Sequence, residues 1–269
     1  MLRRVTEAGT SSTDELKADP LWPEGVGLVL LNEVDSTNAE ARRQENLGLD
    51  GPFWVMARRQ LAGRARRGRN WVSEAGNLYA SLLLPMTSES SAIGTLPLVA
   101  ALAVHRAIEQ VLPHHEQRLR LKWPNDVLIG GAKVNGILLE AGGSMRQRSI
   151  IIGCGINCAH HPDNPAYPAT DLLAEGVDIT PAQLLPRLAR QINDCLVLWS
   201  EGRNFETIRQ LWLERAQGVG MPIRVNMETT TLTGRFAGLD SEGYLLLERS
   251  NGELSRISAG DLFFQTRYE

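Results

Sequence analysis

The sequence predicts an α+β protein: a mixed, largely antiparallel sheet with flanking helices, followed by a small all-β barrel. Three observations support this fold class. Short apolar segments separated by Gly, Asn and Asp turns predict paired strands, and apolar residues at helical spacing predict helices that pack on a sheet. From about Gly218 the chain changes to short strands with regular turns. The 269 residues are enough to bury a sizeable core.

The N-terminal segment, residues 1–25, is polar and shows neither helical nor alternating periodicity, so it is predicted to be a flexible lead-in. The apolar run 26–31 then predicts a strand. Thr37 and Glu40 follow with the spacing of a capping box, which predicts a helix that continues to about Leu47.

The rest of the chain continues this pattern. Further strands of the main body are expected at 53–57, 78–84, 119–123, 127–129, 133–140 and 149–153, and helices at 93–112, 184–199 and 205–216. The barrel strands are expected at 223–225, 230–239, 244–248 and 255–257. The predicted organisation is a lead-in over 1–25, a main domain over 26–217 and a small β domain over 218–269.

Composition argues against several classes of protein. A net charge of −3 and a pI near 6.0 disfavour a surface built throughout for nucleic acid. Apolar runs such as 100–104 are far shorter than the roughly 20 residues that cross a bilayer, and the N-terminus lacks the apolar block of a secretory signal. We therefore expect a cytoplasmic protein. The cysteines, expected to be buried reduced thiols, are Cys154, Cys158 and Cys195.

An arginine-rich loop follows the strand at 53–57. It places six arginines within positions 58–69 of a slightly acidic protein. Guanidinium groups bind phosphate through paired hydrogen bonds, glycines such as Gly63 and Gly68 allow close backbone approach, and Trp71 offers a face on which a base can stack. A nucleotide triphosphate fits this set. The alternatives are a solvated charged loop and a nucleic-acid contact.

Two later segments carry further candidate residues. In the segment Lys122-Trp-Pro-Asn-Asp126, Asp126 could cap a turn, position magnesium indirectly or accept a proton from an amine. Lys133 begins the next strand and could be an edge residue with its ammonium in solvent. Gly136 favours a ligand nearby, because a glycine within a strand often marks close approach. A third segment, 151–157, is predicted to be a buried strand that ends in the side-chain amide of Asn157, which could simply terminate the sheet.

These three segments, in this order and spacing, resemble the catalytic domain of biotin protein ligases. The family's arginine loop appears as Gly63-Arg-Ala-Arg-Arg-Gly-Arg69, its Lys-Trp-Pro-Asn-Asp segment is complete, and its Lys-x-x-Gly-Ile-Leu and Gly-Ile-Asn segments are present. The likeness covers about residues 26–269. It implies a catalytic domain related to class II aminoacyl-tRNA synthetases, followed by an SH3-like barrel. The short lead-in resembles the monofunctional type without an N-terminal DNA-binding domain.

The resemblance implies an ATP-dependent enzyme that makes biotinoyl-5'-AMP and transfers biotin to a lysine of a biotin carboxyl carrier protein. The implied catalytic residues are Lys133, Arg66 and Asp126. The implied biotin-binding residues are Ser36, Thr37, Asn38, Gln60, Gly63, Arg64, Arg66, Lys133 and Gly136. The implied ATP or adenylate residues are Arg66, Arg69, Trp71, Asn125, Lys133 and Asn157.

The resemblance also bears on cofactors and partners. Mg²⁺ is expected to accompany ATP without direct protein ligands, and the acceptor is expected to be a domain of a biotin-dependent carboxylase. Neither specific DNA binding nor membrane binding is expected, and a homodimer is allowed.

The sequence departs from the family pattern at two positions. Ala65 replaces a glycine of the arginine loop, and its methyl group fits only if its φ is negative or it faces solvent. Asn135 stands where a small residue is frequent, beside Gly136. The runner-up function is lipoate or octanoate transfer, which the arginine loop with Trp71 disfavours. A nucleic-acid-binding module formed by the loop and the barrel is disfavoured by the net charge.

Overall fold

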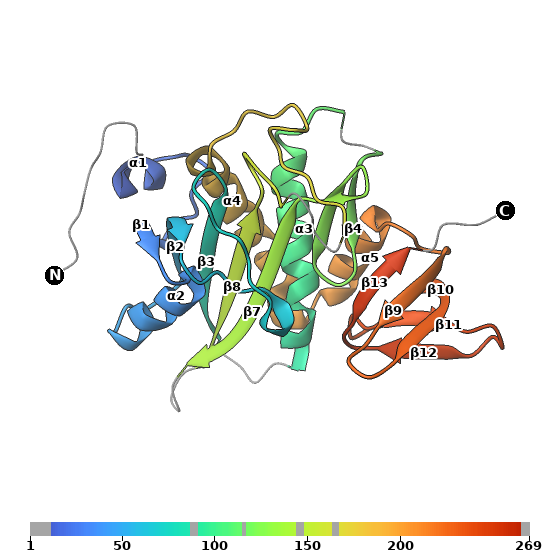
Figure 1. Ribbon diagram of the computed structural model, residues 1–269. Helices are drawn as coiled ribbons and strands as arrows, with labels where there is room; N and C mark the ends of the chain where they lie inside the picture. Colours follow the sequence, from blue (N-terminus) through green and yellow to red (C-terminus); the bar gives the residue numbers. More distant parts are fainter. Residues whose placement is uncertain (1–11, 87–90, 115–116, 144–147, 163–166, 265–269) are drawn as a thin grey trace. The chain divides into compact units, whose positions relative to one another are not determined.

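The protein is described by a computed structural model over residues 12–86, 91–114, 117–143, 148–162 and 167–264 (Figure 1). The chain folds into two compact units. The first unit comprises Met1–Ser88, Gly136–Asn164 and Thr170–Gln191. The second unit comprises Glu89–Asn135, Pro165–Ala169 and Ile192–Glu269. This division differs from the domain boundary expected after residue 217, which stays a prediction.

The first unit is built on a five-stranded sheet in the order β1-β2-β3-β8-β7. Its strands are β1 (Gly27–Val34), β2 (Phe53–Gln60), β3 (Leu78–Met86), β8 (Arg148–Ile156) and β7 (Asn135–Gly143). The pair β1–β2 is parallel, whereas β2–β3 and β3–β8 are antiparallel, which confirms a mixed sheet.

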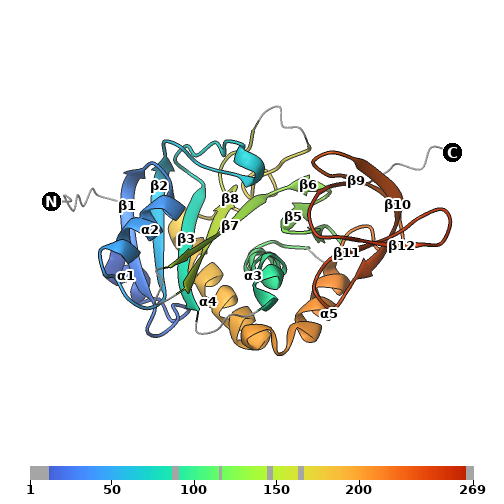
Figure 2. The same cartoon turned by 90° about the horizontal axis from the view of Figure 1, so that it is seen from below.

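Helix α2 (Thr37–Asn46) packs on β2, β3 and β8, as can be followed in Figure 2. The buried side chains of Ala41 on the helix and Phe53, Val55, Leu83 and Ile151 on the strands form one apolar cluster. Burial of these side chains fixes the helix on the sheet. The N-terminus of α2 and the end of β2 are thereby held in defined positions.

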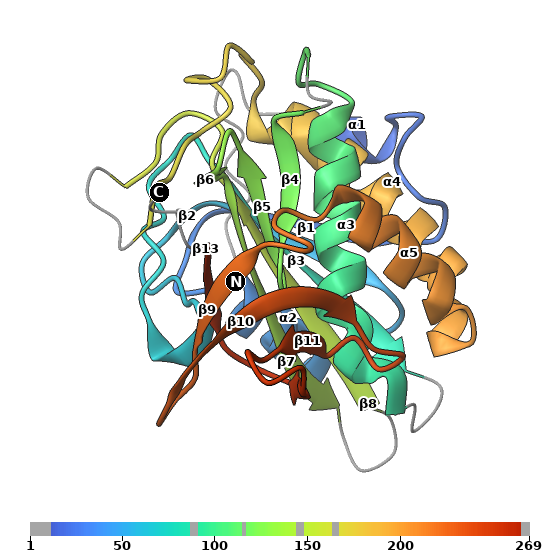
Figure 3. The ribbon, with the colours of Figure 1, turned by 90° about the vertical axis from the view of Figure 1, so that its right-hand side faces the viewer.

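The second unit has a buried helix, α3 (Leu96–Glu109), preceded by the 3-10 turn η2 (Ser91–Thr95). Around it lie α5 (Phe205–Arg215) and a three-stranded sheet of β4 (Leu119–Lys122), β5 (Asp126–Ile129) and β6 (Ala132–Lys133). The packing of α3 beside α5 is visible in Figure 3. Helix α4 (Pro181–Trp199) begins in the first unit and ends in the second, where the 3-10 turn η3 (Ser200–Gly202) follows it.

The C-terminal sheet is also part of the second unit. Its five strands have the order β12-β11-β10-β9-β13, and every recorded pair is antiparallel. The strands are β9 (Pro222–Asn226), β10 (Thr231–Leu239), β11 (Leu245–Glu248), β12 (Leu254–Ile257) and β13 (Asp261–Phe264). The expected change to short antiparallel strands after about residue 218 is confirmed, with β13 as a strand that the sequence pattern did not indicate.

The segment Ala92–Glu109 is long and apolar enough to cross a membrane by length and composition, with a mean hydropathy of 1.3 over 18 residues. In the structure 67% of this segment is buried. Most side chains of α3 lie in the protein core, including those of Leu98, Leu102 and Ile108. The segment therefore has the character of a core helix.

Two expectations for local structure were wrong. The lead-in contains a short helix, α1 (Thr13–Lys17), which Ser12 and Glu15 close with a complete capping box. The strand expected at 133–140 is two strands, β6 and β7, separated by Val134. The Val134 amide bonds to the Val127 carbonyl at 3.1 Å, which ends the pairing of β6 there.

Candidate functional site

The N-terminus of α2 presents polar groups in the first unit. Ser36 is the N-cap, but its side chain makes no capping hydrogen bond. The predicted capping box of Thr37 and Glu40 does not form, because Thr37 is already the first helical residue. Instead, the Thr37 amide and hydroxyl both donate to Oε1 of Gln60, at 2.8 and 3.1 Å, and Glu40 accepts from Arg43. The Ser36 hydroxyl is therefore not used to close the helix.

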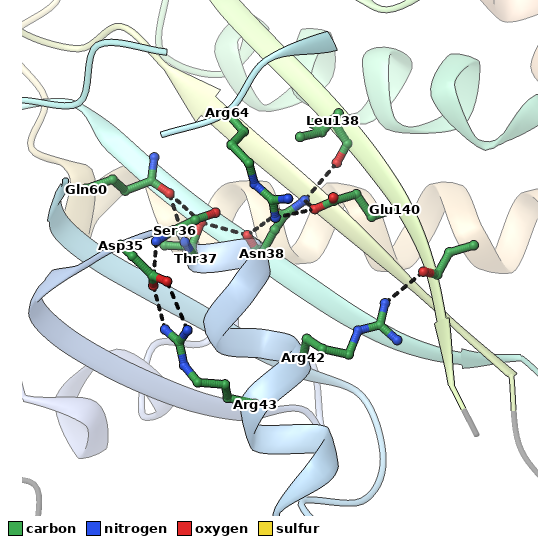
Figure 4. Close-up of polar contacts among 12 residues, drawn as sticks. Asp35, Ser36, Thr37, Asn38, Arg42, Arg43, Gln60, Arg64, Leu138 and Glu140 are labelled. Atoms are coloured by element: carbon green, nitrogen blue, oxygen red, sulfur yellow. Dashed lines mark hydrogen bonds and ion pairs between the residues drawn. The ribbon is translucent and has the colours of Figure 1, made fainter. Parts of the chain in front are cut away.

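An ion pair fixes the turn that enters α2. The Arg43 guanidinium donates to both carboxylate oxygens of Asp35, at 2.9 and 2.5 Å, and one of these oxygens also accepts from the Ser36 amide (Figure 4). The hydrogen bond from Arg43 lowers the pKa of Asp35 to about 2. The Asp35 carbonyl accepts from the Ala62 amide at 2.8 Å. The start of the helix is thus joined to the start of the arginine loop.

A buried polar network extends from the helix into the sheet. The Ser81 hydroxyl on β3 lies 2.7 Å from the Thr37 hydroxyl and 2.6 Å from Oδ1 of Asn38. The side-chain Nδ2 of Asn38 donates to Oε2 of Glu140 on β7 at 2.7 Å. Buried polar groups need such partners. Asn38 therefore cannot turn away without breaking bonds to two strands.

Glu140 also holds the arginine loop. A guanidinium nitrogen of Arg64 lies 2.8 Å from Oε2 of Glu140, and the two side chains are 47% and 30% exposed (Figure 4). Glu140 was not among the predicted site residues. Its only sequence signal was its place at the end of the expected strand that begins at Lys133.

At the base of the arginine loop the two ends of the loop run antiparallel, with an isolated bridge between Arg64 and Asn70. The Gln60 amide bonds to the Ser73 carbonyl, and the Trp71 amide bonds to the Gly63 carbonyl at 2.9 Å. A Cβ atom on Gly63 would lie 2.4 Å from both the Ser73 hydroxyl and the Trp71 carbonyl oxygen. Gly63 is therefore required for the packing of the loop itself.

The tip of the loop contains a 3-10 turn over Arg66–Gly68 (η1). Ala65 has φ −118°, so its methyl group fits the backbone and the departure from the family pattern is accommodated. The left-handed positions are Arg67 with φ 58° and Gly68 with φ 68°. Arg69 donates through its amide and its Nε to the Arg66 carbonyl, both at 3.4 Å.

The indole of Trp71 lies against glycines of two neighbouring strands. A Cβ on Gly136 of β7 would lie 2.7 Å from the ring, and one on Gly155 of β8 would lie 2.7 Å from its Nε1. Within the described residues this Nε1 is buried and has no hydrogen-bond partner. An unpaired buried N–H is unfavourable. A ligand oxygen at this position would remove that cost.

Asn157 follows β8 in the first unit. Its side-chain nitrogen donates to the Thr170 carbonyl at 2.9 Å, and its own carbonyl accepts from the Leu172 amide. The side chain therefore has a structural hydrogen bond at the end of the sheet, in agreement with the simpler of its two interpretations. Its expected contact with a nucleotide stays a prediction.

The second unit contains the remaining candidates, which cluster around Asp126. The Lys133 ammonium lies 2.6 Å from Oδ1 of Asp126, and the Lys122 ammonium lies 3.8 Å from Oδ2. Asp126 is 5% exposed. The neighbouring Asn125 is also buried, and Oδ1 of Asn135 accepts from the Val127 amide at 2.6 Å. Asn135 thus supports β5.

The candidate residues fall into two sets. Contacts in the first unit bring together Ser36, Thr37, Asn38, Gln60, Gly63, Arg64, Trp71 and Gly136. The second unit holds Asn125, Asp126 and Lys133. In the described part of the chain, no group of three or more His, Cys, Asp or Glu side chains is placed to bind a metal ion.

Comparisons with known proteins agree with this inventory. Residues 31–157 match the Biotin/lipoate A/B protein ligase family, and residues 219–265 match the Biotin protein ligase C terminal domain. The biotin–acetyl-CoA-carboxylase ligase of Paracoccus denitrificans is 39% identical over 245 residues, which are 87% of this chain and 99% of that protein. The chain belongs to the biotin protein ligase family.

Two further members of the biotin protein ligase family illustrate the likeness. The bifunctional ligase/repressor BirA of Bacillus subtilis is 32% identical over 97% of this chain and 81% of its own length. The biotin protein ligase of Aquifex aeolicus, solved in complex with biotin and ATP, has a TM-score of 0.75 and 29% identity. The match covers 89% of this chain and 99% of the Aquifex chain.

Proposed function

We propose that this protein activates biotin with ATP to form biotinoyl-5'-AMP and transfers the biotin to a lysine of a biotin carboxyl carrier protein. The observation that carries the proposal is the 39% identity to a biotin–acetyl-CoA-carboxylase ligase over nearly all of that ligase. The polar and cationic groups of the two units support it, because they are those that the two substrates require.

We assign biotin binding to the N-terminus of α2. The ureido ring of biotin offers one carbonyl acceptor and two N–H donors. Hydroxyl groups can both donate and accept, so Ser36 and Thr37 suit this ring. Gln60 and Asn38 hold the helix start in place. Arg64 and the Gly63 backbone are proposed to bind toward the carboxylate end of the molecule.

We assign ATP binding to the arginine loop and to Trp71. An indole face is suited to stacking on adenine, and its unpaired Nε1 offers a hydrogen-bond donor. Arg66 and Arg69 would bind phosphate oxygens, as guanidinium groups do. Asn125 and Asn157 are proposed to contact the adenylate.

The chemistry requires positive charge near the phosphates. A biotin carboxylate oxygen attacks the α-phosphorus, a P–O bond forms, and the bond to pyrophosphate breaks. Lys133 and Arg66 are proposed to stabilise the negative charge that grows on the phosphoryl and leaving groups. Mg²⁺ bound to ATP would supply further charge there, and it commonly keeps waters and phosphate oxygens as ligands.

Transfer needs a neutral amine. The acceptor lysine attacks the acyl carbon, a C–N bond forms, and AMP leaves with the electrons of the C–O bond. Asp126 is proposed to take up the proton that the amine loses. In the structure Asp126 is paired with Lys133, and we propose that these two residues separate during the reaction.

Several finer points belong to the same proposal. We propose that the acceptor is a carboxylase domain, that the protein acts in the cytoplasm, and that it binds neither membranes nor specific DNA sequences. A homodimer is compatible with the proposal.

The experiment that tests the proposal compares which acyl group the protein attaches to a carrier domain. The protein is incubated with ATP, a biotin carboxyl carrier domain, and biotin, lipoate or octanoate, and the mass of the carrier is measured. We expect the mass of one biotinoyl group to be added. A carrier that gains lipoate or octanoate and no biotin would overturn the proposal.

A further inference from the structure

Lys122 is a nearly buried lysine to which the proposed reaction gives no role. It ends β4 and is 9% exposed. Its position is set by strand register, because Lys122 lies directly opposite Asp126 in the β4–β5 pair. A buried ammonium is costly unless charged or polar partners surround it. The groups around Lys122 therefore indicate what it does.

Two aromatic rings lie close to the Lys122 ammonium. It is 4.9 Å from the ring centre of Tyr167 and 5.7 Å from that of Phe263. The two rings also contact each other, with centres 5.6 Å apart. Cations over ring faces are attracted by the quadrupole of the ring, and more strongly where water is excluded. We call Tyr167 and Phe263 the aromatic clamp.

Phe263 brings the C-terminal sheet into this arrangement. It lies on β13, opposite Arg224 of β9, whose guanidinium is 5.0 Å from the ring of Phe263. The next residue, Phe264, packs elsewhere: a Cβ on Gly218 would lie 2.4 Å from its ring. Neighbouring residues of a strand face opposite sides. Only one of the two phenylalanines therefore contacts Lys122.

The Asp126 carboxylate has a lysine at each oxygen. Lys133 is at 2.6 Å from one oxygen and Lys122 at 3.8 Å from the other. In the proposed reaction Lys133 moves from Asp126 to the phosphate. A buried carboxylate that loses a close cation is destabilised in its charged form. The positive charge of Lys122 remains beside Asp126 and opposes that loss.

We propose that Lys122 is a positioning residue: it is the counter-ion that keeps Asp126 charged and in place while Lys133 serves the phosphate, and the aromatic clamp holds it there. Through Phe263, the C-terminal sheet contributes to the reaction. This inference rests on the proposed function. It assigns Lys122 no contact with substrate.

The test measures the rate of biotin transfer to a biotin carboxyl carrier domain and the KM for biotin in matched variants of the full chain. Lys122→Met removes the charge and keeps the length, and we expect kcat to fall at least about tenfold while the KM stays within about twofold. Lys122→Arg restores the charge and should recover most of kcat. A residue that serves only stability would not show this split or this rescue.

The aromatic clamp is tested by Phe263→Leu against its neighbour Phe264→Leu. Both should lower the denaturation midpoint, but only Phe263→Leu should lower kcat, by about threefold or more. If Lys122→Met does not fold, this comparison decides.

The two proposals fail in different ways. An unaltered chain that forms no adenylate overturns the proposed function and this inference with it. An active unaltered chain with a Lys122→Met variant of equal kcat overturns this inference alone. Equal kcat in Phe263→Leu and Phe264→Leu overturns the role of the clamp.

Discussion

Arg64 of the arginine loop and Glu140 of β7 form an ion pair with 2.8 Å between nitrogen and oxygen, and the same Glu140 oxygen accepts from Asn38 of α2. One carboxylate therefore connects the loop, the helix start and the sheet of the first unit. Loss of its charge should release both the Arg64 guanidinium and the Asn38 amide from their present positions.

Glu140→Gln should raise the KM for biotin by about three- to tenfold, because preorganisation of polar groups contributes to binding. The free energy of unfolding should change by less than about 1 kcal/mol, since the pair is partly exposed. Steady-state kinetics and urea unfolding measure the two effects. Glu33→Gln, which alters the exposed pair with Arg59 at 3.5 Å, is the control. An unchanged KM in Glu140→Gln would show that this pair does not support the biotin site.

Gly155→Ala should displace the indole of Trp71, because the new methyl group would lie 2.7 Å from Nε1. Overpacking of this kind costs about 1–3 kcal/mol. We expect the KM for ATP to rise about tenfold or more, with a change in tryptophan fluorescence. Gly94→Ala is the control, since a Cβ there meets no atom within 4 Å. A Gly155→Ala variant with the KM of the unaltered chain would contradict the assignment of Trp71.

Asp35→Asn should make the free energy of unfolding less dependent on pH in the acidic range. The pKa of Asp35 falls from 3.8 to about 2 on pairing with Arg43, so the stabilisation is complete above about pH 4. It disappears as the pH falls toward 2, where the folded protein also takes up the proton. The variant should therefore be less stable than the unaltered chain at pH 6, by an amount that shrinks toward pH 3. Urea unfolding at several pH values measures this. A difference that is constant over the range would contradict the role of the ion pair.

The cysteines should resist alkylation in the folded protein. Burial raises the pKa of Cys154 and Cys158 to about 12 and that of Cys195 to about 11, so the reactive thiolate is scarce near neutral pH. Mass spectrometry after iodoacetamide treatment should show almost no modification at pH 8, and modification of all three thiols in guanidinium chloride. Rapid labelling of Cys195 in the native protein would contradict its buried position.

Much of the fold was predictable because it depends on local patterns. The strands at Phe53 and Leu78 and the helix that ends at Trp199 follow from apolar runs and helical spacing. Helix α1 was missed because five residues are too few to show a period. The capping box of Thr37 does not form because Thr37 is the first helical residue and not the N-cap, and its hydroxyl donates to Gln60, which lies 23 positions away.

The candidate site was also predictable from the sequence only where it depends on local patterns. The arginine loop and the Lys122–Asp126 segment were recognisable from residue type and spacing. Glu140 was not, because its partners Arg64 and Asn38 are 76 and 102 positions away in the chain. The pairing of Lys133 with Asp126 also depends on strand register, which sequence alone left open.

The most direct measurement is the formation of biotinoyl-adenylate from biotin and ATP labelled at the α-phosphate, without any acceptor protein. The unaltered chain should transfer the label to an adenylate of biotin and release pyrophosphate. Lys133→Ala should lower this rate about a hundredfold or more, whereas Lys17→Ala, at an exposed position on α1, should not. No labelled adenylate from the unaltered chain, or an unchanged rate in Lys133→Ala, would contradict the proposed activation step.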